Sequence, residues 1–107
     1  MKVLLDECIP RKLKFALPEH DCKTVPEAGF AGQKNGRLLL LAEDAGFALF
    51  LTMDKGLPFQ QNLAGRRIAL LVLRARSNRL ADLLQHLEAC RAMMSSIRPG
   101  EVIRVGD

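Results

Sequence analysis

Three acidic residues follow two apolar runs of the sequence, and they are the first candidates for chemistry. Asp6 and Glu7 end the run at residues 2–6, and Asp54 follows the run at residues 48–52. If both runs are neighbouring parallel strands, the three carboxylates meet at the carboxyl edge of one sheet. Crowded carboxylates repel one another, so this arrangement is costly unless a cation is present. The alternative is that the acids only terminate strands, because turns are rich in Asp.

The cation that such a site would favour follows from its ligands. Carboxylate oxygens suit Mg²⁺ or Mn²⁺, which bind through a few carboxylates together with waters and substrate phosphate. Such a cation can activate water and stabilise charge on a phosphoryl centre. The pattern of Asp6, Glu7 and Asp54 therefore predicts a metal-assisted reaction at phosphate.

The elements that must position these acids alternate along the chain. Apolar runs predict strands at residues 2–6, 21–25, 48–52, 68–73 and 102–105. Helical spacing predicts helices at residues 10–17, from Asn35 to Gly46, and at residues 80–90, with one further helical turn within residues 55–66. Asn35 and Asn78 are the expected N-caps of the second and last helices. This alternation predicts an α/β fold in three layers, α/β/α, with a mostly parallel sheet.

Length and composition limit the function classes. A chain of 107 residues supports one core, so we expect a single domain over residues 1–107. It has five Phe and no Trp or Tyr, which predicts an aliphatic core and argues against RNA binders that stack bases. Its three cysteines, without C-x-x-C spacing, indicate reduced thiols. We expect a cytoplasmic protein without a membrane partner, because no apolar run reaches about 18 residues.

Basic residues follow the acids. The formal net charge is +4, and no acid occurs between Lys55 and Ala81. Arg74 and Arg76 come just after the strand predicted at residues 68–73, so they should emerge at the same edge as the acids. With Lys55, they are candidates for binding the phosphates of a nucleic acid. The alternative is a solvated basic face.

Three segments together resemble a known family. Leu4-Leu5-Asp6-Glu7, Val25-Pro26-Glu27-Ala28-Gly29 and Leu51-Thr52-Met53-Asp54 are similar to the DUF5615 group of PIN-like domains, over nearly the whole chain. The resemblance implies a PIN-like α/β/α fold and a Mg²⁺- or Mn²⁺-dependent ribonuclease. Such proteins are often toxins of toxin–antitoxin pairs, so the implied partners are RNA and an antitoxin protein. Asp6 and Asp54 then match metal-binding acids, with Glu7 alongside.

The sequence departs from this family at one place. Many relatives carry an acid at the start of the second helix, where this chain has Asn35. A neutral side chain there lowers the charge of the site and weakens metal binding, unless Asn35 is only a helix cap. Glu27 is a reserve candidate for the missing acid, and Thr52 is a further candidate site residue. Glu43 and Asp44 are expected to point sideways or outward into solvent.

Three functions follow as hypotheses. The first is a metal-dependent ribonuclease that hydrolyses RNA phosphodiesters. The second is a degenerate PIN-like module that binds RNA or protein without cleavage. The third is a phospho-acceptor receiver domain, which would also need a Ser or Thr after the fourth strand and a Lys after the fifth. Small domains often assemble, so a homodimer through apolar helix faces is an open alternative.

Overall fold

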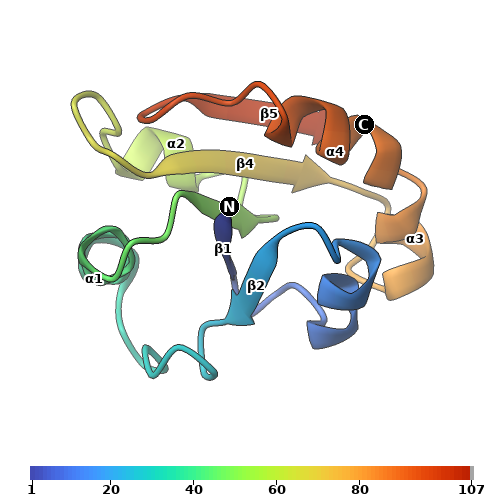
Figure 1. The fold of residues 1–107 in the computed structure, drawn as a ribbon, viewed down its shortest axis with the longest axis horizontal. Coiled ribbons are helices and arrows are strands. Elements are labelled where there is room, and N and C mark those ends of the chain that lie inside the picture. The colour runs from blue at the N-terminus through green and yellow to red at the C-terminus, as the bar shows by residue number, and fades with distance from the viewer. Residues whose placement is uncertain (107) are drawn as a thin grey trace.

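All the strands of the central sheet run in the same direction. The protein is described by a computed structural model that covers residues 1–106. The strands are β1 (Lys2–Leu5), β2 (Asp21–Thr24), β3 (Leu49–Thr52), β4 (Ala69–Arg74) and β5 (Val102–Gly106). They lie in the order β2-β1-β3-β4-β5, and every neighbouring pair is parallel (Figure 1). The predicted α/β fold is confirmed, with a sheet that is wholly rather than mostly parallel.

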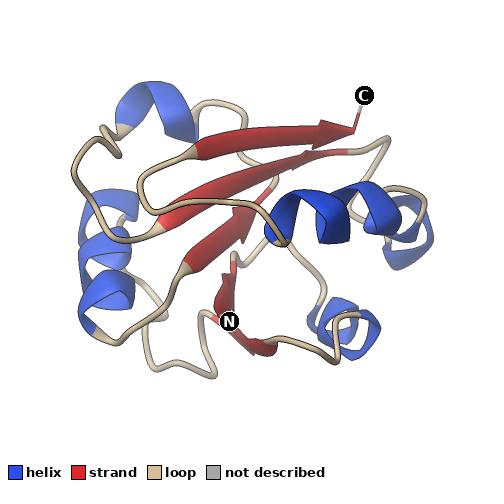
Figure 2. Cartoon of the chain, turned by 45° about the horizontal axis from the view of Figure 1, so that its top comes forward, coloured by secondary structure: helices blue, strands red, loops and turns tan. Residues whose placement is uncertain are grey.

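Helices cover both faces of the sheet (Figure 2). They are η1, a 3-10 helix (Arg11–Ala16), α1 (Asn35–Asp44), α2 (Leu57–Gln60), α3 (Leu80–Leu84) and α4 (Leu87–Met94). The buried side chains of α1 and α2 belong to the apolar cluster on one face, and those of η1, α3 and α4 to the cluster on the other. The architecture therefore has the three layers that the alternation predicts. None of these helices is long and apolar enough to cross a membrane.

The strands are apolar along their length because both of their faces are covered. Along β3 and β4, alternate residues enter different clusters: Phe50 and Val72 pack under α1 and α2, whereas Leu51 and Leu71 pack under the other helices. These four side chains are at most 1% exposed. Continuous apolar runs are typical of parallel strands buried in this way.

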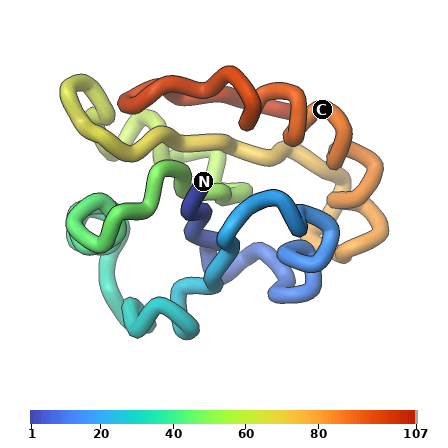
Figure 3. The backbone as a smooth tube through the Cα atoms, in the orientation of Figure 1, coloured from blue at the N-terminus to red at the C-terminus, as the bar shows by residue number. Residues whose placement is uncertain are grey.

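The strand order places a crossover at the centre of the sheet. From β1 the chain passes to β2 on one side, and it then returns to β3 on the other side and continues outward to β4 and β5 (Figure 3). Leu5 at the end of β1 lies opposite both Thr24 of β2 and Leu51 of β3. Open parallel sheets bind ligands at such a switch point, outside the carboxyl ends of the strands.

Two expectations about helices were wrong. The helix predicted at residues 80–90 is divided into α3 and α4, because α3 packs against η1 while α4 packs against β5, and one straight helix would not follow both. The predicted caps are also shifted. Lys34, not Asn35, occupies the N-cap position of α1, and Arg79, not Asn78, that of α3. Asn78 instead donates a hydrogen bond to the Cys8 carbonyl oxygen at 3.2 Å.

Candidate functional site

The two aspartates follow neighbouring strands at the switch point. Asp6 comes directly after β1, and its backbone N–H extends the ladder to the Leu51 carbonyl oxygen at 2.9 Å. The Thr52 hydroxyl donates to Asp6 Oδ2 at 2.6 Å and accepts the backbone N–H of Asp54 at 3.0 Å. One buried hydroxyl thus links the Asp6 carboxylate to the loop that carries Asp54. The structure thus connects the Asp6 side chain to the backbone of Asp54 through Thr52, a further candidate residue.

Backbone N–H groups fix the orientation of both carboxylates. The N–H of Glu7 donates to Asp6 Oδ1 at 2.8 Å, and the N–H of Gly56 donates to Asp54 Oδ1 at 2.9 Å. Asp54 Oδ2 accepts no hydrogen bond from the part of the chain that the structure describes. Asp6 and Asp54 are both partly buried, whereas Glu7 is exposed. The carboxylates are therefore held in place with spare acceptor capacity on their oxygens.

The three acids do not form a closed metal site. Within residues 1–106, no three His, Cys, Asp or Glu side chains are grouped so that they could hold a metal ion. Glu7 therefore does not complete the three-carboxylate cluster expected with Asp6 and Asp54. Mg²⁺ commonly binds proteins through only one or two carboxylates and keeps several waters. Two carboxylates are enough for an open, water-rich Mg²⁺ or Mn²⁺ site, but they are too few for an all-protein cage.

Cys8 lies beside these acids but is unsuited to nucleophilic chemistry. Burial raises the pKa of its thiol and outweighs a hydrogen bond with the Met53 backbone that lowers it, and the negative charge of Asp6 raises the pKa further. A thiol must lose its proton to act as a nucleophile. Cys8 is partly buried against the apolar cluster under η1, which agrees with a packing role.

Glu27, the reserve acid, is occupied elsewhere. Its Oε2 accepts hydrogen bonds from Lys14 Nζ at 2.8 Å and Arg11 Nε at 3.0 Å, and its Oε1 accepts the Thr24 N–H at 2.9 Å. The bond with Lys14, followed by those with Thr24 and Arg11, lowers the pKa of this carboxyl to about 2. Two cations already balance its charge, so Glu27 is a tie between η1 and the end of β2.

The acids of α1 lie away from the candidate site. Glu43 is not solvated as expected: its Oε2 accepts the N–H of Arg67 at 2.8 Å, just before β4 begins. Hydrogen bonds from the backbone of Arg67 and Ile68 lower the pKa of this carboxyl. Asp44 is exposed, as expected. Glu43 therefore fixes the entry to β4, at the amino edge of the sheet.

Asn35 is the first residue of α1 and makes no capping hydrogen bond. The helix start lies against the segment after α2, since a Cβ on Gly36 would be 3.4 Å from the Gln61 side-chain oxygen. The structure thus removes the cap interpretation of Asn35. It leaves a neutral amide where the family resemblance implies an acid.

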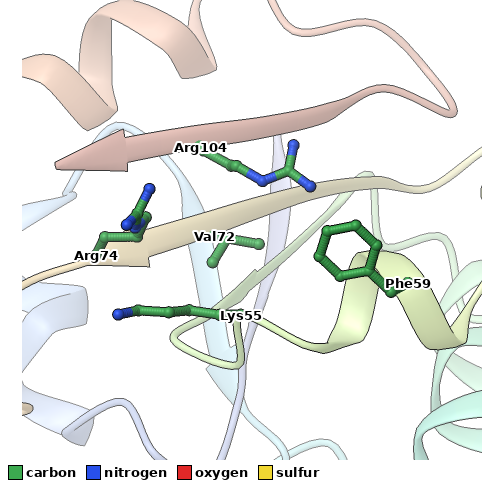
Figure 4. A pocket seen from close by; sticks show the side chains of 5 residues that line it. All are labelled: Lys55, Phe59, Val72, Arg74 and Arg104. Atoms are coloured by element: carbon green, nitrogen blue, oxygen red, sulfur yellow. The ribbon is translucent and has the colours of Figure 1, made fainter. Parts of the chain in front are cut away.

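The basic residues separate into two hollows. Lys55 and Arg74 line one cavity together with Phe59, Val72 and Arg104 (Figure 4). Arg76 does not join them, and it lines another hollow with Ser77, Arg79, Ala81 and Asp82. Alternation along β4 puts Val72 and Arg74 on the α2 face, and the chain then turns toward α3. Phe59 and Arg104 were missed by sequence reasoning, although Phe59 is the only aromatic residue of the segment 55–66.

The elements of a receiver domain are incomplete in the described residues. β4 ends at Arg74, where a receiver domain would need a Ser or Thr. Comparison with known proteins does not decide between the remaining hypotheses. No family model, curated protein or solved structure matches the chain.

Proposed function

We propose that this protein is a metal-dependent ribonuclease that hydrolyses RNA phosphodiesters at the carboxyl ends of β1 and β3. The observation that carries the proposal is the Thr52 hydroxyl, which links the Asp6 carboxylate to the Asp54 loop at the switch point of the sheet. In parallel sheets this is the place where ligands bind. Asp6 and Asp54 would share one Mg²⁺ or Mn²⁺.

Two further features support a phosphodiester substrate. Lys55 follows Asp54 directly, and it lines a cavity with Arg74, so a cationic cavity begins at the residue after Asp54. The segments around Asp6 and Asp54 also resemble the DUF5615 group of PIN-like domains. That resemblance implies RNA as the substrate, and it implies a toxin whose partner is an antitoxin protein.

Each residue would have a separate task. A bound Mg²⁺ or Mn²⁺ would activate a water and stabilise the negative charge that develops on the phosphoryl group. The carboxylates of Asp6 and Asp54 would hold it, and Thr52 would keep Asp6 oriented as a positioning residue. Lys55 and Arg74 would bind non-bridging phosphate oxygens through charge-assisted hydrogen bonds.

The test is cleavage of a labelled single-stranded RNA by the purified protein with Mn²⁺. We expect cleavage that stops on addition of EDTA, and we expect Asp6→Asn and Asp54→Asn to lower the initial rate by about 100-fold or more. Asp44→Asn is the matched control, because this exposed carboxylate at the end of α1 should leave the rate unchanged. Cleavage by Asp54→Asn at the wild-type rate would refute the proposed mechanism.

A second candidate function is RNA binding without cleavage. It is favoured by Asn35 in place of an acid and by the absence of any three-carboxylate group within residues 1–106. Fewer acidic ligands lower the affinity for a divalent cation. In the same assay this function gives a protein that binds the RNA and leaves it intact with Mn²⁺.

A further inference from the structure

A cavity of about 240 Å³ opens on the α2 face of the sheet, beside the residue that follows Asp54. Val72 of β4 forms its buried floor, and Figure 4 shows Lys55 and Arg74 toward one end and Phe59 toward the other. Arg104 reaches this cavity from β5, because it pairs in register with Val72 and shares its face. The cavity is therefore lined by α2, β4, β5 and the residue that follows Asp54.

The polar lining of this cavity is entirely cationic. Lys55, Arg74 and Arg104 supply three positive charges, and none of them forms an ion pair with a carboxylate within residues 1–106. Arg74 Nε is also buried without a hydrogen-bond partner in the described part of the chain. Like charges repel, and a buried donor without a partner is costly. An anion in the cavity would relieve both costs.

The apolar wall of the cavity is an exposed aromatic ring. Phe59 is 84% exposed, although Phe47 and Phe50 are buried in the core. The Arg104 guanidinium lies 5.7 Å from the centre of the Phe59 ring. An aromatic ring beside cations is the combination that single-stranded nucleic acids use, because bases stack on the ring while phosphates bind the charges.

We propose that this cavity is a nucleotide subsite for single-stranded RNA, in which one exposed phenylalanine supplies the stacking that the low aromatic content argued against. One unpaired base stacks on Phe59 beside Arg104, and a neighbouring phosphate binds Arg74 and Lys55. The cavity is smaller than the roughly 300–1,000 Å³ of sites that enclose drug-sized ligands, which suits one residue of a longer strand crossing the surface. The choice of RNA rests on the proposed function, and through Lys55 the strand would reach Asp54.

A second exposed phenylalanine provides a matched comparison. Phe15 on η1 is 68% exposed, and Lys14 Nζ lies 5.8 Å from its ring centre. However, Lys14 is already paired with Glu27, and Phe15 does not line the cationic cavity. Phe15 thus lacks both the unpaired cation and the cavity that accompany Phe59, and we expect that it does not bind RNA.

The test is the fluorescence anisotropy of a labelled single-stranded RNA titrated with protein in EDTA, where cleavage cannot occur. We expect Phe59→Ala to weaken binding about tenfold or more, and Phe15→Ala to leave it unchanged. A labelled abasic strand should bind Phe59→Ala and wild type equally, because it has no base to stack. Arg74→Gln should lower the slope of log affinity against log salt by about 0.7, whereas Lys12→Gln, on exposed η1, should not.

Equal binding of the RNA by Phe59→Ala and wild type would overturn the subsite. An equal loss of affinity for the abasic strand in Phe59→Ala would also overturn it, because the substitution would then have altered the fold of the protein and not a contact with a base. Phe59→Leu keeps an apolar side chain without the aromatic ring, and it should show the same base-dependent loss. Because EDTA removes the divalent cation, this assay tests the subsite without the metal, so failure of the metal proposal is distinguished from failure of the subsite.

Discussion

At the scale of single residues, Thr52 supports the candidate site more than its type suggests. Among the described residues it is the only polar one that is fully buried. Its hydroxyl both donates to Asp6 and accepts from the backbone of Asp54. Because it ends β3, which pairs with β1, this oxygen connects the two loops that carry the acids, and the backbone N–H groups of Glu7 and Gly56 orient the carboxylates as well.

We therefore expect Thr52→Val to affect both stability and metal binding. The near-isosteric change leaves Asp6 Oδ2 and the Asp54 N–H without their partner, so the free energy of unfolding in urea should fall by about 1–3 kcal/mol. Mn²⁺ affinity should fall as well, because Asp6 loses its orientation. Thr24→Val is the control, since its hydroxyl accepts only the Glu27 N–H. An unchanged Mn²⁺ affinity in Thr52→Val would contradict the positioning role.

Single residues also show how far sequence reasoning reaches. The position of Asp6 and Asp54 just after buried strands could be predicted, because an acid has no role in the apolar core and marks where each strand ends. Phe59 and Arg104 could not, because their meeting depends on the register of β5 and on where the short helix α2 lies. Glu27 looked like a spare acid until Lys14 and Arg11, from a different element, were seen to pair with it.

At the scale of elements, Glu27 ties η1 to the end of β2 through a charge-dependent contact. Its pKa is lowered to about 2 from an ordinary value of 4.5, chiefly by the hydrogen bond with Lys14. A lowered pKa means that the contact stabilises the fold above about pH 4.5, and that this stabilisation is lost as the pH falls toward 2.

The corresponding prediction concerns Glu27→Gln. Compared with wild type, this variant should be less stable at pH 7, and the difference should shrink as the pH falls from 4.5 toward 2. Urea unfolding at several pH values measures it, with Glu88→Gln on exposed α4 as the control. A stability difference that stays constant down to pH 2 would show that the charge of Glu27 is not responsible.

The turn that leads into β5 gives a second prediction at this scale. Gly100 has φ +80°, and a Cβ there would lie 3.0 Å from the Leu63 carbonyl oxygen, whereas Gly65 has φ +77° with nothing within 4 Å. Alanine in the left-handed region costs roughly 1–2 kcal/mol at either position. Gly100→Ala should therefore lower the free energy of unfolding more than Gly65→Ala, because only Gly100 also meets crowding. If urea unfolding shows the same loss of unfolding free energy in both variants, the Leu63 backbone moves aside without cost and the crowding argument is wrong.

The elements also mark a limit of sequence prediction. Leu80, Leu83, Leu87 and Cys90 recur at helical spacing, so one long helix was the natural expectation. The spacing does not show that α3 must pack on η1 and α4 on β5, which changes the direction of the chain between them. Tertiary packing therefore decides where a helix is interrupted, and the sequence pattern does not show it. The strands were predicted well because buried parallel strands are continuous apolar runs.

At the scale of the whole molecule, the strand order gives the candidate site its place. The sequence predicted five strands and a parallel sheet, but their order depends on which side each crossover takes. The order found places β1 beside β3, so two acids that are distant along the chain follow adjacent strands. The cavity lined by Lys55, Arg74 and Arg104 lies on the α2 face, and it is there that we propose an anionic substrate binds.

The most direct test of the central claim, that Asp6 and Asp54 together bind a divalent cation, is calorimetric titration of the metal-free protein with Mn²⁺. We expect wild type and Asp44→Asn to bind one Mn²⁺ per chain with the same affinity, and Asp6→Asn and Asp54→Asn to bind it at least about tenfold more weakly, because each loses a carboxylate ligand. Absence of binding heat for wild type, or equal affinity in Asp54→Asn, would contradict the account.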